Sequence, residues 1–329
     1  MSPTTLADVA RDVGVSTAAA SLALNGKPGV SERTRDRVLE AAARLGYRPN
    51  PVGRALRQAK VGAIGLYLPS TAVHFGYYSE VTTGIAEALH LEGSSVTLLP
   101  NVAHGRRADA FPRVDGFILI EPHSDDPGVA EILSQNLPTV TGDRPPPEAG
   151  SPWGLVESPN EETVRLIYDR FLTAGSRRPG LLQIERVSEW SVELERGYLA
   201  WCAERGVTPR IASVSIHDTN EELVRDLADF FDAKSGCDAV FAAGDGIAMR
   251  IAGILRSLGK SLGTDVRLVS GVDSPMMAFH TPPITAIDLQ PRLFGRRCAE
   301  LMLDLLDSER PTSPVRWTVP SPLIPRASG

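Results

Sequence analysis

The sequence predicts an α/β protein in which a small three-helix head and a hinge helix precede a body of two doubly wound lobes. Three observations predict this arrangement. Two short helical patterns meet at a turn around Gly14, a further helical pattern begins at Pro51, and from Val61 onward Val/Ile/Leu-rich runs alternate with amphipathic helical patterns. With 329 residues the chain is long enough for the head and for one or two larger domains, each with its own core.

The head has the outline of a helix-turn-helix. Thr5 and Ser16 are placed to cap the first two helices, and Asn25 and Gly26 tolerate the left-handed conformation that ends the second. A third helix is expected from a cap at Ser31 to residue 45. The residues expected on its apolar face are Val38, Leu39, Ala42 and Leu45. Two helices joined by such a turn can place the second one in a DNA major groove.

A short helical segment follows the head. Asn50 is placed to cap it, Pro51 suits the first helical position, and Val52, Ala55 and Leu56 follow at helical spacing. A helix of about two turns is marginal by itself because nucleation is costly and few hydrogen bonds follow. We therefore expect this helix to form only when it packs against another surface.

Charge is distributed unevenly along the chain. The net charge is −6, but residues 1–60 carry ten Lys/Arg and five Asp/Glu, which gives this segment +5 and the remainder −11. A basic segment neutralises DNA phosphates, while an acidic body discourages non-specific adhesion to nucleic acid. For Arg33, Arg35 and Arg37 an alternative stays open, since charges at the start of a capped helix often only solvate it.

The composition indicates a cytoplasmic protein without a cofactor. No apolar stretch reaches the length of about 18 residues that a membrane span needs, and the N-terminus lacks the basic start and apolar run of a secretory signal. Cys202, Cys237 and Cys298 lie far apart, so no disulfide framework and no metal-binding cysteine pair is expected. They are interpreted as small apolar core residues in a reducing compartment.

The body is expected to form two lobes. In the first lobe, the expected strands are residues 62–68, 95–99, 116–120 and 139–141, with helices 78–91 and 127–135. After a proline-rich stretch at 145–147, the second lobe is expected to contain helices 160–174, 191–205 and 220–233 and strands 180–184, 211–216 and 239–243. The tail is expected to form a strand at 284–289, a helix at 291–306 and a strand at 315–324. Lobes of this kind bind ligands in the crevice beyond the carboxyl ends of their strands.

Head and hinge motifs together resemble the LacI-type family of lactose and purine repressors, and the resemblance covers essentially the whole chain. Segments of the body that resemble the family are residues 175–178, 243–248, 269–273, 281–285 and 295–300. The resemblance implies a periplasmic-binding-protein-like body that encloses a small-molecule effector, with a chain that crosses between lobes near residues 158, 289 and 319. It also implies a hinge helix that folds against its dimer mate on DNA and wedges a leucine into the minor groove.

These inferences divide the chain into three parts. Residues 1–48 form the helix-turn-helix head, residues 49–60 the hinge, and residues 61–329 the effector-binding and dimerisation body. Lobe 1 is expected at about 61–158 and 290–318, and lobe 2 at about 159–289 and 319–329. The expected function is that of a transcriptional regulator, a repressor, that binds a pseudo-palindromic operator as a homodimer.

The match to the family assigns DNA contacts residue by residue. Thr17, Ala18 and Leu22 occupy base-facing positions, and because none of them carries a bidentate fork, apolar contact with thymine methyl groups is favoured over hydrogen-bond readout. Leu56 is expected to insert between base steps, with packing of the hinge on the head as the alternative. The other expected DNA-contacting residues are Ser16, Ser21, Asn25, Ser31, Thr34, Asn50, Arg54 and Arg57. For Ser16 and Ser31, plain helix capping is an alternative that is compatible with phosphate contact.

Effector contacts are assigned in the same way. Asp245 and Asp273 each follow an expected strand and match family positions that orient sugars or nucleobases, while capping of the next helix is the alternative. The further positions carried over are Phe75, Gly76, Glu121, Asp143, Trp190 and His217. For Trp190 and His217, packing remains the alternative.

At three positions the chain departs from the family pattern. Leu194 stands where an arginine often clamps the ligand, Gly244 replaces the usual asparagine before Asp245, and Pro291 replaces a frequent aromatic residue near the start of the tail helix. Together these departures remove polar clamps and stacking surface. They leave open a more apolar, a different or an absent effector beside a typical sugar.

Two other functions compete with DNA binding. An enzyme would need a catalytic motif, but Met249 replaces the third glycine of a dinucleotide fingerprint that begins at Gly244, and no nucleophile elbow, zinc-protease motif or Walker loop occurs. A solute-binding protein of a transport system would have the same kind of body. Such a protein needs a signal peptide, however, and a basic DNA-binding head would serve no function in it. Both alternatives are therefore disfavoured.

Overall fold

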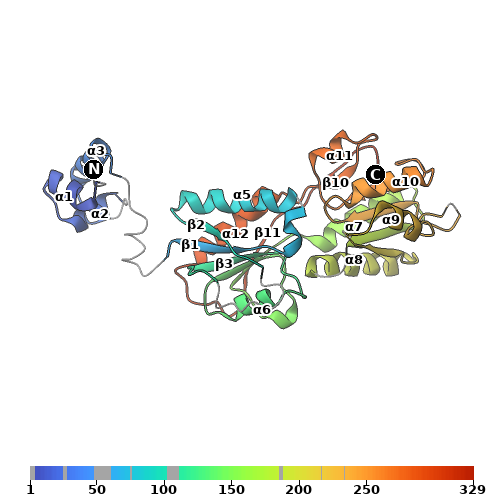
Figure 1. Ribbon diagram of the computed structural model, residues 1–329, viewed down its shortest axis with the longest axis horizontal. Helices are drawn as coiled ribbons and strands as arrows, with labels where there is room; N and C mark the ends of the chain where they lie inside the picture. Colours follow the sequence, from blue (N-terminus) through green and yellow to red (C-terminus); the bar gives the residue numbers. More distant parts are fainter. Residues whose placement is uncertain are drawn as a thin grey trace. The chain divides into compact units, whose positions relative to one another are not determined.

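The computed structural model describes residues 4–24, 28–47, 61–74, 76–101, 111–184, 188–215, 217–232 and 234–329. The chain divides into two compact units, residues 1–62 and residues 63–329 (Figure 1). The first unit is helical, and the second contains two parallel sheets covered by helices, so the predicted α/β class is confirmed.

The head consists of three helices, α1 (Leu6–Val13), α2 (Thr17–Leu24) and α3 (Glu32–Arg44). Thr5 caps α1 as predicted, because its side chain accepts a hydrogen bond from the Asp8 backbone while the Asp8 carboxylate accepts from the Thr5 backbone at 2.9 Å. Gly14 ends the helix in the left-handed conformation with a φ of 72°. The buried core of the head is made by Val9, Ala10, Val13, Ala20, Ala23, Val38, Ala41 and Ala42. Leu39, expected on the apolar face of α3, is instead 47% exposed.

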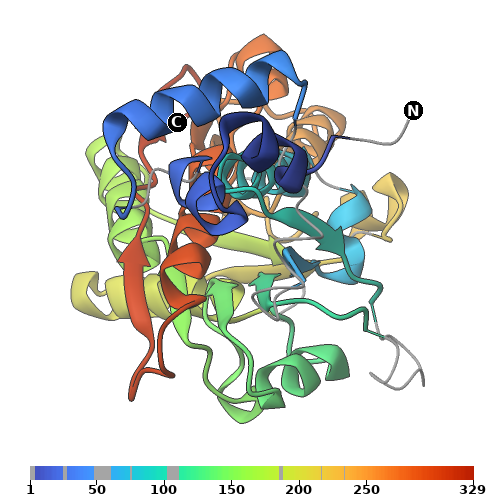
Figure 2. The same ribbon diagram turned by 90° about the vertical axis from the view of Figure 1, so that its left-hand side faces the viewer.

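Lobe 1 is built on a six-stranded, all-parallel sheet with the order β11-β5-β4-β3-β1-β2. Its strands are β1 (Ala63–Tyr67), β2 (Ser95–Leu98), β3 (Gly116–Ile120), β4 (Thr139–Gly142), β5 (Gly154–Glu157) and β11 (Val315–Thr318). Helices α5 (Gly76–Leu91) and α12 (Pro291–Leu305) pack on one face and α6 (Pro127–Ser134) on the other, as Figures 1 and 2 show for α5 and α6. Short 3-10 helices, η1 (Ser70–His74) and η3 (Pro147–Ala149), lie in its loops.

Lobe 2 repeats this design with the strand order β12-β10-β9-β8-β6-β7. Its strands are β6 (Pro179–Ile184), β7 (Ile211–Val214), β8 (Ala239–Ala243), β9 (Arg267–Ser270), β10 (Thr285–Ile287) and β12 (Leu323–Ile324), of which β12 is antiparallel to β10. Its helices are α7 (Asn160–Thr173), α8 (Glu189–Arg205), α9 (Asn220–Asp226), α10 (Ile247–Ser257) and α11 (Pro275–Phe279). Alternate residues of β8 face the two cores, since Phe241 packs with α7 and α8 and Val240 with α9 and α10.

Two expectations about elements need correction, and several elements were not predicted. The helix expected at 220–233 ends at Asp226, and turns follow it. The single strand expected at 315–324 is two strands, β11 and β12, which belong to different sheets. No range was predicted for strands β5 and β9 or for helices α10 and α11. Strand β5 is only four residues long and follows a stretch rich in proline and glycine.

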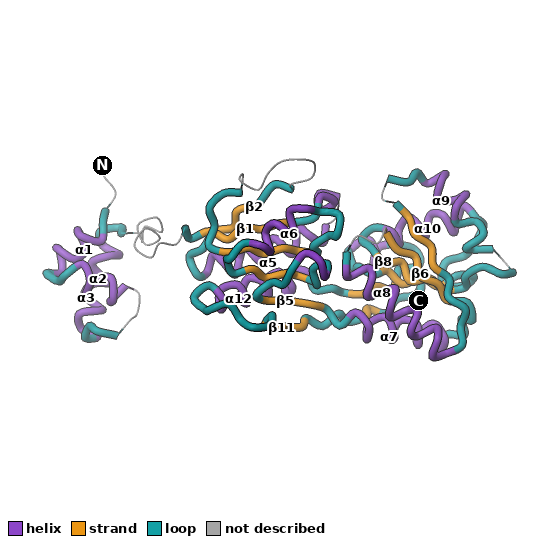
Figure 3. Tube along the Cα trace, turned by 90° about the horizontal axis from the view of Figure 1, so that it is seen from below, coloured by secondary structure: helices purple, strands orange, loops and turns teal. Residues whose placement is uncertain are grey.

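The chain passes between the two sheets three times. These passages are residues 158–159 between β5 and α7, 288–290 between β10 and α12, and 319–322 between β11 and β12 (Figure 3). Both lobes therefore contain segments that are distant in sequence. In the described residues, no helix is long and apolar enough to cross a membrane.

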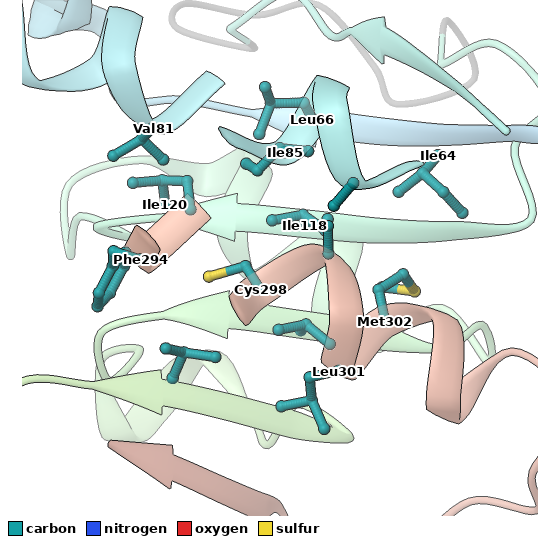
Figure 4. Close-up of a cluster of buried hydrophobic side chains, with 14 of the residues drawn as sticks. Ile64, Leu66, Val81, Ile85, Ile118, Ile120, Phe294, Cys298, Leu301 and Met302 are labelled. Atoms are coloured by element: carbon teal, nitrogen blue, oxygen red, sulfur yellow. The ribbon is translucent and has the colours of Figure 1, made fainter. Parts of the chain in front are cut away.

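The core of lobe 1 depends on a close approach of α5 and α12. Val81 and Ile85 of α5 pack with Phe294, Cys298 and Met302 of α12 above the strands (Figure 4). Two glycines make the approach possible. A Cβ atom at Gly84 would lie 2.1 Å from the Arg292 carbonyl oxygen, and one at Gly295 would lie 2.1 Å from the Val81 carbonyl oxygen. Both glycines are therefore required for contact between the two backbones.

Candidate functional site

The second helix of the head presents one face to solvent. Ala20 and Ala23 are buried against the other helices, whereas Ser16, Thr17 and Ala18 are exposed. Ser21 and Leu22 are partly exposed. The predicted base-facing and phosphate-facing residues thus lie at the start and along the outer side of α2, where a helix-turn-helix contacts DNA.

Helix capping accounts for one role of the two serines. The Ser16 hydroxyl accepts a hydrogen bond from the Ala19 backbone at 3.1 Å, and the Ser31 hydroxyl accepts one from the Thr34 backbone at 3.3 Å. The Ser31 and Thr34 hydroxyls also lie 2.9 Å apart. Since both serines are exposed and a helix N-terminus attracts anions, these caps remain compatible with contact to phosphate.

Several arginines of the head form hydrogen bonds or ion pairs with other groups of the head. Arg37 donates to the Val13 carbonyl at 2.8 Å and so ties α3 to the end of α1. Arg11 pairs with Asp8 at 3.0 Å, and Arg44 pairs with Asp12. Arg37 therefore has a structural role beyond the two considered from the sequence.

Several predicted site residues lie outside the described residues. They are Asn25, Asn50, Arg54, Leu56 and Arg57 of the DNA-binding set and Phe75 of the effector set. Their assignments stay predictions.

In the body, a cavity of about 200 Å³ lies where the carboxyl ends of the strands of both lobes face each other. Lobe 1 contributes Ser70, Thr71, Tyr77, Tyr78, Glu121, His123, Asp125 and Asp143. Lobe 2 and the passages contribute Gln183, Ile184, Ser188, Trp190, Ser191, Ser215, His217, Ala243, Gly244, Asp245, Val272 and Leu289. This is the place at which doubly wound sheets bind ligands. Six of the predicted effector residues line it, namely Glu121, Asp143, Trp190, His217, Gly244 and Asp245.

Two carboxylates enter the cavity from the strand ends of lobe 1. Glu121 follows β3 and Asp143 follows β4, and both have a positive φ, 46° and 69°. Such a conformation is uncommon for residues with side chains and is concentrated at functional sites. A carboxylate oxygen of Glu121 accepts a hydrogen bond from the Tyr78 hydroxyl. Asp143 is only 9% exposed, and burial, followed by the charges of Glu121, Glu193 and Glu157, raises its pKa well above the usual value.

Asp245 connects the two lobes across the cavity. It follows β8 in lobe 2, and its Oδ2 accepts a hydrogen bond from the Tyr77 backbone N–H at 3.4 Å, in the first turn of α5 in lobe 1. The next helix, α10, has Gly246 as its N-cap residue and no side-chain cap. Asp245 therefore does not cap the following helix, which was the alternative considered from the sequence.

Four of the effector residues expected from the sequence do not line the cavity. Both carboxylate oxygens of Asp273 accept hydrogen bonds from Arg326, at 2.7 and 2.8 Å, so Asp273 anchors the C-terminal segment. Leu194 is 2% exposed in the core between α7 and α8. Gly76 and Pro291 are the first residues of α5 and α12. The position of the expected ligand-clamping arginine is thus part of the hydrophobic core.

Sequence reasoning also missed several lining residues. Gln183 is 1% exposed on β6, where its Nε2 donates to Glu195 at 2.7 Å while its Oε1 has no hydrogen-bond partner in the described structure. His123 and Ser215 follow β3 and β7, and Tyr77 and Tyr78 open α5. A search of every strand end for polar side chains would have found His123 and Ser215. In the described part of the chain, no group of His, Cys, Asp and Glu side chains can hold a metal ion.

Two family models match the chain. The one described as bacterial regulatory proteins of the lacI family matches residues 5–50, and the one described as a periplasmic binding protein-like domain matches residues 168–329. The HTH-type transcriptional regulator CelR of Thermobifida fusca is 29% identical over 334 residues, which cover 99% of this chain and 98% of that protein.

Solved structures agree with these matches. A complex of the transcriptional regulator CelR with cellobiose has a TM-score of 0.70 at 27% identity, with 99% of this chain and 100% of that chain covered. A lac repressor dimer bound to operator and the anti-inducer ONPF has a TM-score of 0.74 at 22% identity, with 99% of each chain covered, and shares the fold.

A helix-turn-helix head joined to a periplasmic-binding-protein-like body defines a class of bacterial transcriptional regulators. The chain belongs to this class, and within it to the LacI family. It is therefore a DNA-binding regulator of transcription. The enzyme alternative is set aside because the relatives are regulators, and the transport alternative because the head is a regulatory one.

Proposed function

We propose that this regulator is a cytoplasmic repressor that binds a pseudo-palindromic operator as a homodimer and responds to a small molecule in the cavity between its lobes. In this proposal residues 1–48 are the head, 49–60 the hinge and 61–329 the body, with lobe 1 at about 61–158 and 290–318 and lobe 2 at about 159–289 and 319–329. The observation that carries the proposal is the cavity at the facing strand ends, in a chain whose head exposes the outer side of α2.

The DNA contacts we propose begin in the head. Thr17, Ala18 and Leu22 lie on the accessible side of α2 and offer apolar or single-hydroxyl contacts to base edges. Ser16, Ser21, Ser31 and Thr34 are hydroxyl residues placed to reach phosphates. Because the base-facing side chains lack a bidentate fork, much of the sequence preference falls to the hinge and to the shape of the DNA.

The hinge contacts rest on the sequence alone. Asn50 caps the hinge helix, Arg54 and Arg57 contact phosphates, and Leu56 inserts into the minor groove between base steps. Such insertion costs a few kcal/mol of stacking energy, which the contacts of the bent duplex offset. A helix this short needs its dimer mate as a packing partner, and this supports a homodimer.

The effector contacts we propose are the side chains that line the cavity. Glu121, Asp143 and Asp245 are carboxylates at strand ends, and Trp190 and His217 come from lobe 2. That the CelR relative forms a complex with cellobiose supports a small-molecule ligand here. Because both lobes line the cavity, a ligand in it contacts both and can favour one arrangement of the lobes over another.

Selection from a random pool of DNA duplexes tests this function. The full chain is mixed with the pool, and the retained duplexes are sequenced over several rounds. We expect an inverted repeat whose two halves reflect the symmetry of a homodimer. Enrichment of a single half-site without an inverted copy, or no enrichment above the starting pool, would contradict the proposal.

A further inference from the structure

Among the described residues, the side chains that line the cavity between the lobes carry acidic charges and no permanent positive charge. Four carboxylates line it, those of Glu121, Asp125, Asp143 and Asp245, and no lysine or arginine is among the described lining residues. Asp125 contributes least, because its side chain is 71% exposed and is therefore well solvated. The three others lie at the strand ends where a ligand is held.

Hydrogen-bond acceptors of this cavity lack protein partners among the described residues. The carboxylate of Asp143 is nine-tenths buried and has no side-chain hydrogen bond or ion pair with another described residue. The Oε1 atom of Gln183 is fully buried and likewise lacks a partner there. Buried polar groups are nearly always satisfied, so the buried Oε1 atom of Gln183, in the same cavity as the carboxylate of Asp143, indicates a ligand that donates hydrogen bonds.

Two ligand clamps expected from the family pattern, an arginine and an amide, are missing from the same cavity. The residue in the position of the ligand-clamping arginine, Leu194, is buried in the core, and Gly244 offers no side chain in place of an amide. Beside the acids, the cavity is lined by the aromatic side chains of Tyr77, Tyr78 and Trp190 together with several hydroxyl groups, two histidines and Gln183. Aromatic faces and carboxylates are the two kinds of group that stabilise an organic cation.

We infer that the effector is a small organic cation whose protonated amine is held at Asp143 and whose body packs against the aromatic side chains of the cavity. This inference rests on the proposed function, because it names the chemical class that occupies the effector site. An ammonium group donates three hydrogen bonds and accepts none, which suits a cavity that offers carboxylates and the unpartnered Oε1 atom of Gln183. The positive charge of the ammonium group also stabilises the ionised form of Asp143. Burial and the neighbouring carboxylates disfavour that form, because they raise the pKa of Asp143.

Matched pairs of amines and neutral isosteres test the inference on the full chain. The pairs are D-glucosamine with D-glucose, putrescine with 1,4-butanediol, and 2-phenylethylamine with 2-phenylethanol, and the readouts are the melting temperature and calorimetric affinity. We expect at least one amine to raise the melting temperature in a dose-dependent way while its neutral isostere does not. Equal binding by the neutral isosteres, or no binding by any amine, would overturn the inference.

Variants locate the amine within the cavity. Asp143→Asn keeps the size of the side chain and removes its charge, and we expect it to weaken the amine about 10-fold or more. Asp304→Asn removes the same charge from an exposed position of α12 outside the cavity and should leave the affinity unchanged. Unchanged amine affinity in Asp143→Asn would place the cation elsewhere and refute the assignment.

Measurements of DNA binding distinguish a failure of this inference from a failure of the proposed function. Fluorescence anisotropy with a selected operator is measured with and without the bound amine. If the amine binds through Asp143 but leaves operator affinity unchanged, the cation site stands and the effector role fails. If instead a neutral sugar such as cellobiose binds and changes operator affinity, the proposed function stands and the cation inference is refuted.

Discussion

At the scale of single residues, Asp143 is the buried carboxylate whose environment most opposes its charge. Its pKa is raised above the usual 3.8 in the folded protein, so the folded state holds the proton to a higher pH than the unfolded state does. The contribution of this group to stability is therefore fully present below about pH 3.8 and is lost as the pH rises through the folded pKa.

We expect Asp143→Asn to stabilise the ligand-free protein at neutral pH, because asparagine keeps the shape and never ionises. A gain of about 1 kcal/mol corresponds to a rise in melting temperature of about 2–4 °C for a body of this size. The gain should shrink as the pH falls toward about 4, where aspartate itself is protonated. Thermal unfolding of the wild-type protein and of Asp143→Asn between about pH 4 and neutral pH measures this difference in stability. A lower melting temperature of the variant at neutral pH would contradict the prediction.

Leu56 is the residue on which sequence preference is expected to depend. We predict that Leu56→Ala weakens binding to the selected operator much more than binding to random DNA, because only a cognate site accepts the kink that the wedge exploits. Removing Arg54 or Arg57 should lower affinity for all sequences and flatten its salt dependence. Anisotropy titrations on both DNAs decide this, and an unchanged ratio of cognate to random affinity in Leu56→Ala would show that the hinge assignment is wrong.

How far the sequence predicted the cavity depends on what each side chain contacts. Glu121, Asp143 and Asp245 follow strands, and strand ends meet at the cavity in any doubly wound lobe. Asp273 also follows a strand, but its partner Arg326 lies 53 residues further along the chain, and sequence reasoning gave no reason to pair them. The acidic character was therefore predictable, while the exclusion of Asp273 required the fold.

At the scale of elements, the contact between α5 and α12 gives the sharpest prediction. We expect Gly84→Ala to destabilise the body by about 1–3 kcal/mol, since the new methyl group meets the Arg292 backbone and the two helices must separate. Gly253→Ala is the matched control, because Gly253 lies in α10 with no heavy atom within 4 Å of the added Cβ, and it should stabilise by about 0.5–1 kcal/mol. Chemical denaturation of both variants measures the two effects, and equal effects would contradict the close approach.

The elements themselves were predictable where they are long and periodic. Helices α5, α7, α8 and α12 and strands β1, β3, β4, β6 and β8 lie close to their expected positions, because each buries one apolar face or a continuous apolar run. The two strands of the C-terminal segment were harder to predict, because the run from Val315 to Ile324 has strand character throughout. Only the positions of the two sheets decide that β11 pairs with β5 in lobe 1 and β12 with β10 in lobe 2.

At the scale of the whole body, a few polar contacts hold the lobes together around the cavity. Arg144 follows β4 in lobe 1, and its Nε lies 3.2 Å from Oε1 of Glu193 on α8 in lobe 2 and 2.8 Å from Oε2 of Glu157. An isolated β-bridge joins His123 to Ser188. The side chain of Glu193 is only 9% exposed, so removal of Arg144 would leave a buried carboxylate whose negative charge is less well balanced.

We predict that Arg144→Ala shifts the arrangement of the lobes and weakens the effector about 5-fold or more, because the ligand must contact both lobes at once. The matched control is Arg316→Ala, which removes a 3.2 Å contact to the same Glu157 but leaves the contacts between lobes intact. The effector is the molecule that most raises the melting temperature of the full chain, and its affinity is measured by calorimetry with and without operator. Operator must change this affinity by the same factor as the effector changes operator affinity, typically about 5- to 150-fold. Unaltered effector and operator affinities in Arg144→Ala would mean that the arrangement of the lobes does not depend on this contact, and the coupling between cavity and DNA would have to run through other residues.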